Sequence, residues 1–155
     1  MHKHFLQQAI ELAVDNVTDH NGGPYGAVIV NQGKVIAASG NRVTANIDPT
    51  AHAEVMAIRQ ACQVLNDFKL TNCTLYTSCE PCPMCLGAIY WAHLDNVYYA
   101  CNRIDAAKAG FDDSFIYNEI ALKPENRQIS MQQVKMTNAQ EPFLTWRMQE
   151  SKTRY

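Results

Sequence analysis

Hydrophobic positions in the first forty residues follow two periods, one helical and one alternating. A helical period predicts a first helix that carries Leu6, Ile10, Ala13, Val14 and Val17 and ends at the NGG turn. Two short β-type runs follow, GAVIV and KVIAAS, and the residues between them are Asn31, Gln32 and Gly33. This order predicts a helix followed by a β-hairpin.

Helices and strands then alternate along the chain. The pattern predicts a second helix from near Thr50, followed by a buried strand at CTLYT (Cys73 to Thr77). It then predicts a third helix from about Pro81 to His93 and another strand at NVYYA. The remaining residues predict a short helix from Phe115 to Ile120, a strand from Ile129 to Lys135 and a last helix from about Pro142. We expect an α/β fold with helices on both faces of a mixed sheet.

Composition favours one intracellular domain. The 155 residues suit a single domain spanning 1–155, because no repeat or linker composition interrupts them. The sequence has no recognisable secretory signal and no run long enough to span a bilayer, so we expect a cytoplasmic protein. Its 13 basic and 15 acidic residues give a net charge of −2 without a basic cluster, which disfavours a nucleic-acid partner. In a reducing compartment, clustered cysteines more often bind metal than form disulfides.

The stretch SCEPCPMC contains three of the six cysteines. Pro81 suits the first position of a helix, which would put Cys82 and Cys85 inside that helix on one face. The positive end of the helix dipole lowers thiol pKa values and so favours two thiolate ligands. Cys79 precedes the helix, and the CEPC spacing keeps it as an alternative ligand.

The HAE stretch supplies the complementary chemistry. His52 and Glu54 converge best from the first turn of the second helix, so His52 becomes the third metal ligand. Two thiolates and one imidazole suit zinc, although iron fits the same ligands. Three protein ligands leave a fourth position for water, as in catalytic zinc sites, and Glu54 beside that water would move protons.

The order H-x-E followed by P-C-x-x-C is the signature of zinc nucleobase deaminases. Four segments resemble the bacterial guanine deaminase family: NGGPYGAVIV, DPTAHAEV, LYTSCEPCPMCLGAIYWA and DAAKAGFDDSFIYNEI. The resemblance implies a three-layer cytidine-deaminase-like fold and hydrolysis of guanine to xanthine and ammonia. A hydroxide on zinc would attack the amino-bearing ring carbon while Glu54 shuttles protons. The resemblance also implies a homodimer whose subunits exchange their C-terminal parts.

The same resemblance assigns further residues. Asn41 in SGNRVT would hydrogen-bond the purine, and Asp113 in GFDDS would be a second proton carrier, chosen over Asp112 only by the resemblance. Tyr25, Trp91 and Tyr155 would line the ring pocket, and Tyr25 stands where an aromatic, often Phe, is expected. Each has a structural alternative: a turn residue for Asn41, a cap for the aspartates, and packing for the aromatics.

Three other functions stay open. The zinc motifs also suit a tRNA adenosine deaminase, although the acidic balance and the lack of a basic stripe disfavour it. Small-molecule deaminases of cytosine or other aminated rings share the same motifs. In a different class, a non-catalytic module would use zinc to hold its fold. Such a module would not need Glu54, and a fourth protein ligand such as Cys79 would favour it.

Overall fold

The computed structural model describes residues Met1–Tyr155. The chain divides into two compact units, Met1–Asp113 and Ser114–Tyr155, and each is described by itself. None of the helices has the length and apolar character needed to cross a membrane.

The first unit contains a four-stranded sheet in the order β2-β1-β3-β4. Its strands are β1 (Gly26–Asn31), β2 (Lys34–Gly40), β3 (Cys73–Cys79) and β4 (Asn96–Cys101). β1 pairs antiparallel with β2 and β3, whereas β3 and β4 are parallel, so the predicted mixed sheet is confirmed. The hairpin between β1 and β2 is also confirmed, and its turn residues Gln32 and Gly33 both have positive φ, as a tight hairpin turn requires.

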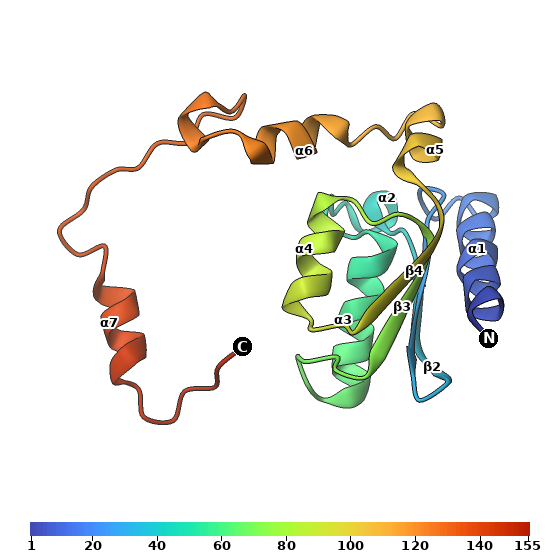
Figure 1. The fold of residues 1–155 in the computed structure, drawn as a ribbon, viewed down its shortest axis with the longest axis horizontal. Helices are drawn as coiled ribbons and strands as arrows, with labels where there is room; N and C mark the ends of the chain where they lie inside the picture. Colours follow the sequence, from blue (N-terminus) through green and yellow to red (C-terminus); the bar gives the residue numbers. More distant parts are fainter. The chain divides into compact units, whose positions relative to one another are not determined.

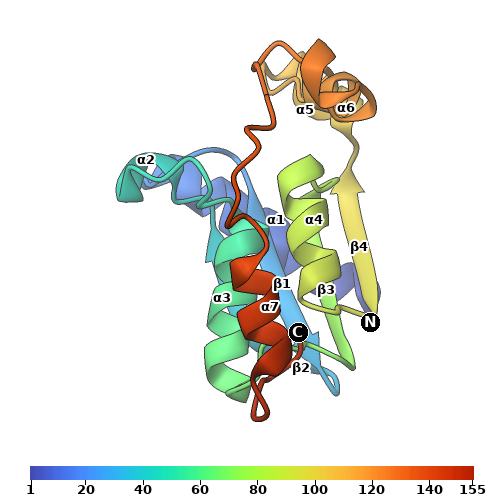
Figure 2. The same cartoon turned by 90° about the vertical axis from the view of Figure 1, so that its left-hand side faces the viewer.

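Helices cover both faces of this sheet, which confirms the three-layer prediction. Figures 1 and 2 show α1 (His2–Thr18) on one face, and α3 (Ala53–Leu65) and α4 (Pro83–Trp91) on the other. Alternating β1 side chains separate two buried clusters. Val28 and Val30 pack with Phe5 of α1, while Ile29 packs in the cluster that includes Ile58 of α3. α1 and α3 therefore bury apolar side chains against opposite faces of β1.

Several boundaries differ from the sequence prediction. α3 begins at Ala53 and α4 at Pro83, so His52 and Cys82 are the N-cap residues. The prediction that Cys82 lies inside the helix is therefore wrong by one position, because Pro83 rather than Pro81 occupies the first helical position. Two short helices, α2 (Val43–Asn46) and α5 (Arg103–Lys108), were not predicted. Their lengths are too short to produce a clear hydrophobic period.

The second unit contains α6 (Ser114–Ala121), the 3₁₀-helix η1 (Pro124–Asn126) and α7 (Glu141–Met148). Both predicted α-helices are present, but the predicted strand from Ile129 to Lys135 is wrong. A strand needs the backbone groups of a partner strand, and residues 114–155 contain no other strand to provide them. Just before this segment, the guanidinium of Arg127 donates to the last carbonyls of α6, including Glu119 O at 3.0 Å. No residue of this unit is buried.

Candidate zinc-dependent deaminase site

The predicted metal ligands and Asn41 lie at one end of the sheet. The register places the start of β1 beside the ends of β2 and β3, with Gly26 opposite Gly40 and Ala27 opposite Thr77. Because β4 runs parallel to β3, its end at Cys101 lies beside Cys79. The N-terminal ends of α3 and α4 supply the metal-ligating side chains at this end. Three strand ends and two helix starts therefore frame the site.

The structure brings His52, Cys82 and Cys85 together. The Nδ1 atom of His52 lies 3.5 Å from each of the two sulfur atoms, and all three ligand atoms lie within 4.8 Å of one another. Atoms bound to one tetrahedral zinc at about 2.1 Å for nitrogen and about 2.3 Å for sulfur would be about 3.6 Å apart. The observed separations fit this ion with little movement of the side chains.

Electrostatic interactions in the cluster favour a bound thiolate. Interaction with the Cys85 thiol, assisted by His52, lowers the pKa of Cys82 to about 4. The same interaction with Cys82, together with burial, raises the pKa of Cys85. Interaction with Cys82 also raises the pKa of His52. Cys82 is therefore the thiol that loses its proton more readily, and thiols bind a metal ion in the deprotonated form.

Glu54 lies beside the three ligands without belonging to their group. Its side chain is 3% exposed, and burial is the main cause that raises the pKa of its carboxyl. The Thr77 hydroxyl donates to Oε1 at 3.1 Å, and the Cys85 thiol donates to Oε2 at 3.5 Å. Thr77 was not identified from the sequence, because its position in a buried strand gives no pattern that distinguishes it from its neighbours. The carboxylate is therefore held in a fixed orientation beside the cluster.

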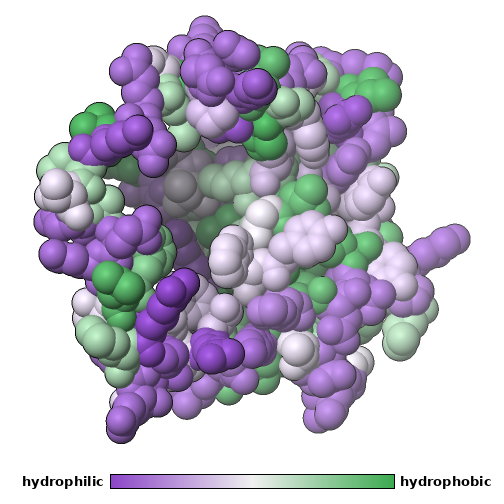
Figure 3. Space-filling view, turned by 60° about the vertical axis from the view of Figure 1, so that its left-hand side comes forward, coloured by the Kyte–Doolittle hydropathy of each residue, from purple (hydrophilic) through white to green (hydrophobic).

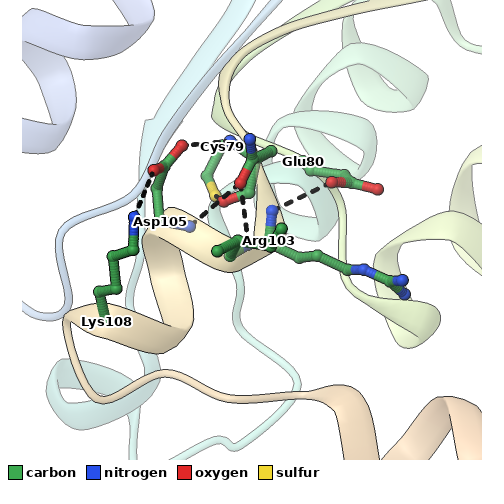
Figure 4. A network of polar contacts seen from close by, with 7 residues as sticks. Cys79, Glu80, Arg103, Asp105 and Lys108 are labelled. Carbon is green, nitrogen blue, oxygen red and sulfur yellow. Dashed lines mark hydrogen bonds and ion pairs between the residues drawn. The ribbon is translucent and has the colours of Figure 1, made fainter.

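Cys79 is not a member of the ligand group. Its thiol donates instead to the backbone oxygen of Asn102 at 3.6 Å, within the network shown in Figure 4. In the same network, Glu80 accepts a hydrogen bond from the backbone N–H of Arg103 at 3.0 Å, and Asn102 forms a capping box with Asp105. These bonds fix the start of α5 against the loop that leads to Cys82.

Asp113 follows α5 and lies within electrostatic range of the cluster. Burial is the first cause that raises the pKa of its carboxyl, and the negative charge of Cys82 is the second. Burial likewise raises the pKa of the Tyr25 phenol, and the nearby charges of Glu54 and Asp113 add to the shift. The phenol ring packs edge-on against Phe111, with ring centres 5.3 Å apart. Asp113 and Tyr25 therefore approach the site from the same region of the first unit.

Asn41 follows β2 directly and is 6% exposed. Its Oδ1 atom accepts a hydrogen bond from the backbone N–H of Val43 at 3.1 Å and another from Gly23 at 3.4 Å. The next residue, Arg42, donates its backbone N–H to Ala51 O at 2.8 Å, immediately before His52. Asn41 is thus anchored next to the segment that carries the imidazole ligand.

The remaining two predicted residues lie farther from the cluster or outside the first unit. Trp91 is the last residue of α4 and is 69% exposed. Because an α-helix rises about 1.5 Å per residue, Trp91 lies about 12 Å along the axis from the start of α4. Tyr155 belongs to the second unit and is 75% exposed. The other three cysteines, Cys62, Cys73 and Cys101, are free thiols outside the ligand group.

Residues 1–101 match the family model of the cytidine and deoxycytidylate deaminase zinc-binding region. The chain belongs to this deaminase family. It is 55% identical over 154 residues to the guanine deaminase of Bacillus subtilis (strain 168), and the similarity covers 99% of each chain. The X-ray structure of guanine deaminase from Bacillus subtilis matches with a TM-score of 0.99 and covers 100% of this chain and 99% of that chain.

A second group of relatives in the deaminase family matches only part of the chain. The tRNA-specific adenosine deaminase of Agrobacterium fabrum (strain C58 / ATCC 33970) is 42% identical over 96 residues, which is 62% of each protein.

The resemblance to guanine deaminases and the cytidine-deaminase-like fold are both confirmed by the full-length similarity. The expected zinc is likewise supported by the family and by the His/Cys/Cys cluster.

Proposed function

We propose that this chain is a zinc-dependent guanine deaminase that converts guanine and water to xanthine and ammonia. The observation that carries the proposal is the buried Glu54 carboxylate beside the cluster of His52, Cys82 and Cys85. A structural zinc site has no use for a buried carboxylate that is not a ligand, since burying such a group costs free energy. The full-length similarity to a guanine deaminase supports guanine rather than another aminated ring.

His52, Cys82 and Cys85 would hold the zinc ion. When bound, zinc supplies a Lewis acid that makes water a nucleophile near neutral pH. Glu54 removes a proton from the attacking water and delivers protons to a ring nitrogen and to the departing ammonia. Its bond from Thr77 holds Oε1, so Oε2 is the atom directed toward the ligands. Burial favours this exchange, because it raises the pKa of the carboxyl toward the working range of a general acid and base.

Asp113 would be a second proton carrier. The amino group of guanine is attached to a carbon between two ring nitrogens, so protons are needed at several atoms during attack and release. The raised pKa of Asp113 and its interaction with the charge of Cys82 support this role. Asn41 would donate a hydrogen bond to the purine, and Tyr25 would line the ring pocket with a phenol that stays protonated, because its pKa is raised.

A homodimer with exchanged C-terminal parts accounts for the apolar surface of the chain. In the second unit, Phe115, Ile129 and Phe143 are all more than half exposed, and no residue of that unit is buried. A segment of this size without a core is not stable by itself. Hydrophobic side chains also reach the surface in several places on the face shown in Figure 3. We assign Trp91 and Tyr155 to the closing of the purine pocket when a second copy covers these surfaces.

The thiolate ligands require reduced cysteines, which supports a cytoplasmic location. All six cysteines are free in the structure.

The test of this function is ammonia release by purified protein of known zinc content. Guanine, adenine, cytosine and a tRNA anticodon stem-loop are compared in parallel, with Glu54→Gln as the control. We expect rapid release from guanine alone, and at least a hundredfold loss in the variant because proton transfer contributes about 10²–10⁴ to such reactions.

Other outcomes would separate the remaining functions. Activity on the stem-loop with salt-sensitive binding would indicate a tRNA adenosine deaminase instead. Activity on adenine or cytosine but not guanine would keep the zinc chemistry and discard the substrate. Bound zinc without activity on any of the four, in both the parent protein and Glu54→Gln, would indicate a non-catalytic zinc module.

A further inference from the structure

Asn16 is a buried polar residue to which the chemistry described above gives no role. It lies on α1 with a side chain that is only 4% exposed. Its Nδ2 atom donates to two backbone carbonyls, Gly23 O at 2.8 Å and Asn41 O at 2.9 Å. A buried amide in a helix that faces a sheet is costly unless such bonds satisfy it. One side chain of α1 therefore joins the loop after that helix to the segment after β2.

These contacts leave Asn41 one chemical role toward a ligand. The backbone of Asn41 is held at both ends, because its N–H donates to Tyr25 O at 3.0 Å and its carbonyl accepts from Asn16. Its side-chain Oδ1 faces two backbone donors, the N–H groups of Val43 and Gly23. An amide whose oxygen is occupied offers only its NH₂ group to a further partner. Asn41 is thus fixed as a hydrogen-bond donor.

Two glycines allow this close approach. A Cβ atom added to Gly22 would lie 2.5 Å from Asn41 O, and one added to Gly40 would lie 2.5 Å from Oδ1 of Asn16. Neither distance leaves room for a side chain. The loop, α1 and the end of β2 are therefore in contact through backbone atoms and the one asparagine side chain. A change at Asn16 alters the position of Asn41 directly, since no flexible side chain lies between them.

We infer that Asn16 is a positioning residue that holds the Asn41 amide as a donor toward the purine ring. The inference rests on the proposed function, in which Asn41 binds the substrate. It adds a condition on the substrate class: the ring edge that meets Asn41 must present a hydrogen-bond acceptor, as ring nitrogens and carbonyl oxygens of oxopurines do. An edge that presents an amino group there would place two donors against each other.

The test is a double-mutant cycle in the zinc-loaded enzyme with Asn16→Ala, Asn41→Ala and the double variant. We expect Asn16→Ala to raise the KM for guanine roughly tenfold, the size of one misplaced hydrogen bond, with a smaller change in kcat. The double variant should have the KM of Asn41→Ala alone, because Asn16 acts through Asn41. Asn31→Ala is the matched control: its amide also makes one side-chain contact, with Cys73 at 3.2 Å, but lies at the other end of β1. Its KM should not change.

Two results would overturn the inference while leaving the proposed function intact. One is a raised KM in Asn41→Ala with an unchanged KM in Asn16→Ala. The other is fully additive effects in the double variant. An unchanged KM in Asn41→Ala itself would instead refute the purine-binding role proposed for that residue.

A second variant and a measurement on the unaltered enzyme cover the case in which Asn16→Ala does not fold. Asn16→Asp keeps the side-chain shape but replaces the donating NH₂ group with an accepting oxygen. Both bonds that Asn16 donates are then lost, and the KM for guanine should also rise. In the unaltered enzyme, nuclear magnetic resonance should show slow hydrogen exchange at the Asn16 side-chain amide, and a shift of the Asn41 side-chain amide on addition of guanine. Exchange at Asn16 as fast as in an exposed asparagine would overturn the inference.

Discussion

Replacing Thr77 by valine removes one hydrogen bond to Glu54 and nearly preserves the shape of the side chain. Thr77 has no exposed surface, and its hydroxyl lies 3.1 Å from Oε1 of Glu54. A hydrogen bond to a charged group contributes about 1.5–3 kcal/mol, and about 1.4 kcal/mol corresponds to a factor of ten. If Thr77 holds Glu54 in its reactive orientation, Thr77→Val should lower kcat/KM for guanine by about 10- to 150-fold. The zinc content should remain that of the parent protein.

The assay is steady-state ammonia release, with zinc measured in the same preparations and thermal unfolding as a check of the fold. Thr74→Val is the matched control, because Thr74 lies on the same strand and forms no hydrogen bond with Glu54. Its kcat/KM should change by less than about twofold, because the half-buried Thr74 lies at the opposite end of β3 from Cys79. If Thr77→Val retained kcat/KM within twofold while folded and loaded with zinc, Thr77 would not orient the catalytic carboxylate.

Three further predictions address the metal, the second carboxylate and the assembly. Removal of zinc by a chelator should abolish ammonia release, and added zinc should restore it. The His52→Ala variant should lose both zinc and activity. Ammonia release without metal would refute the zinc chemistry. Asp113→Asn should lower kcat by about 10²-fold or more with zinc retained, whereas Asp112→Asn should stay near the parent value; the reverse result would assign the role to Asp112. Sedimentation of the full chain should give a dimer, and a chain ending at Asp113 should lose activity; a fully active monomer would refute the exchanged assembly.

The contacts that set the charges of Glu54 and Asp113 depend on the tertiary structure, and the spacing of residues in the sequence does not reveal them. The sequence predicted that His52, Cys82 and Cys85 would meet, because a proline-led helix start and a second helix start each present their side chains from one end. It could not show that Glu54 would be the carboxylate held by Thr77, since a threonine in a buried strand has no distinctive period. Nor could it show that the negative charge of Cys82 acts on Asp113.

The amino-acid sequence by itself determined the three layers, the hairpin and the residues that form the His/Cys/Cys cluster, because hydrophobic periods, turn residues and short motif spacings are local properties of the chain. It failed for the expected strand at Ile129 to Lys135, since a strand depends on a partner that local pattern does not reveal. Only the tertiary structure decided that the Cys79 thiol donates to Asn102 and does not join His52, Cys82 and Cys85, and that Asn16 bonds to Asn41. Those contacts join residues from separate elements, and their partners are fixed by how the helices pack on the sheet.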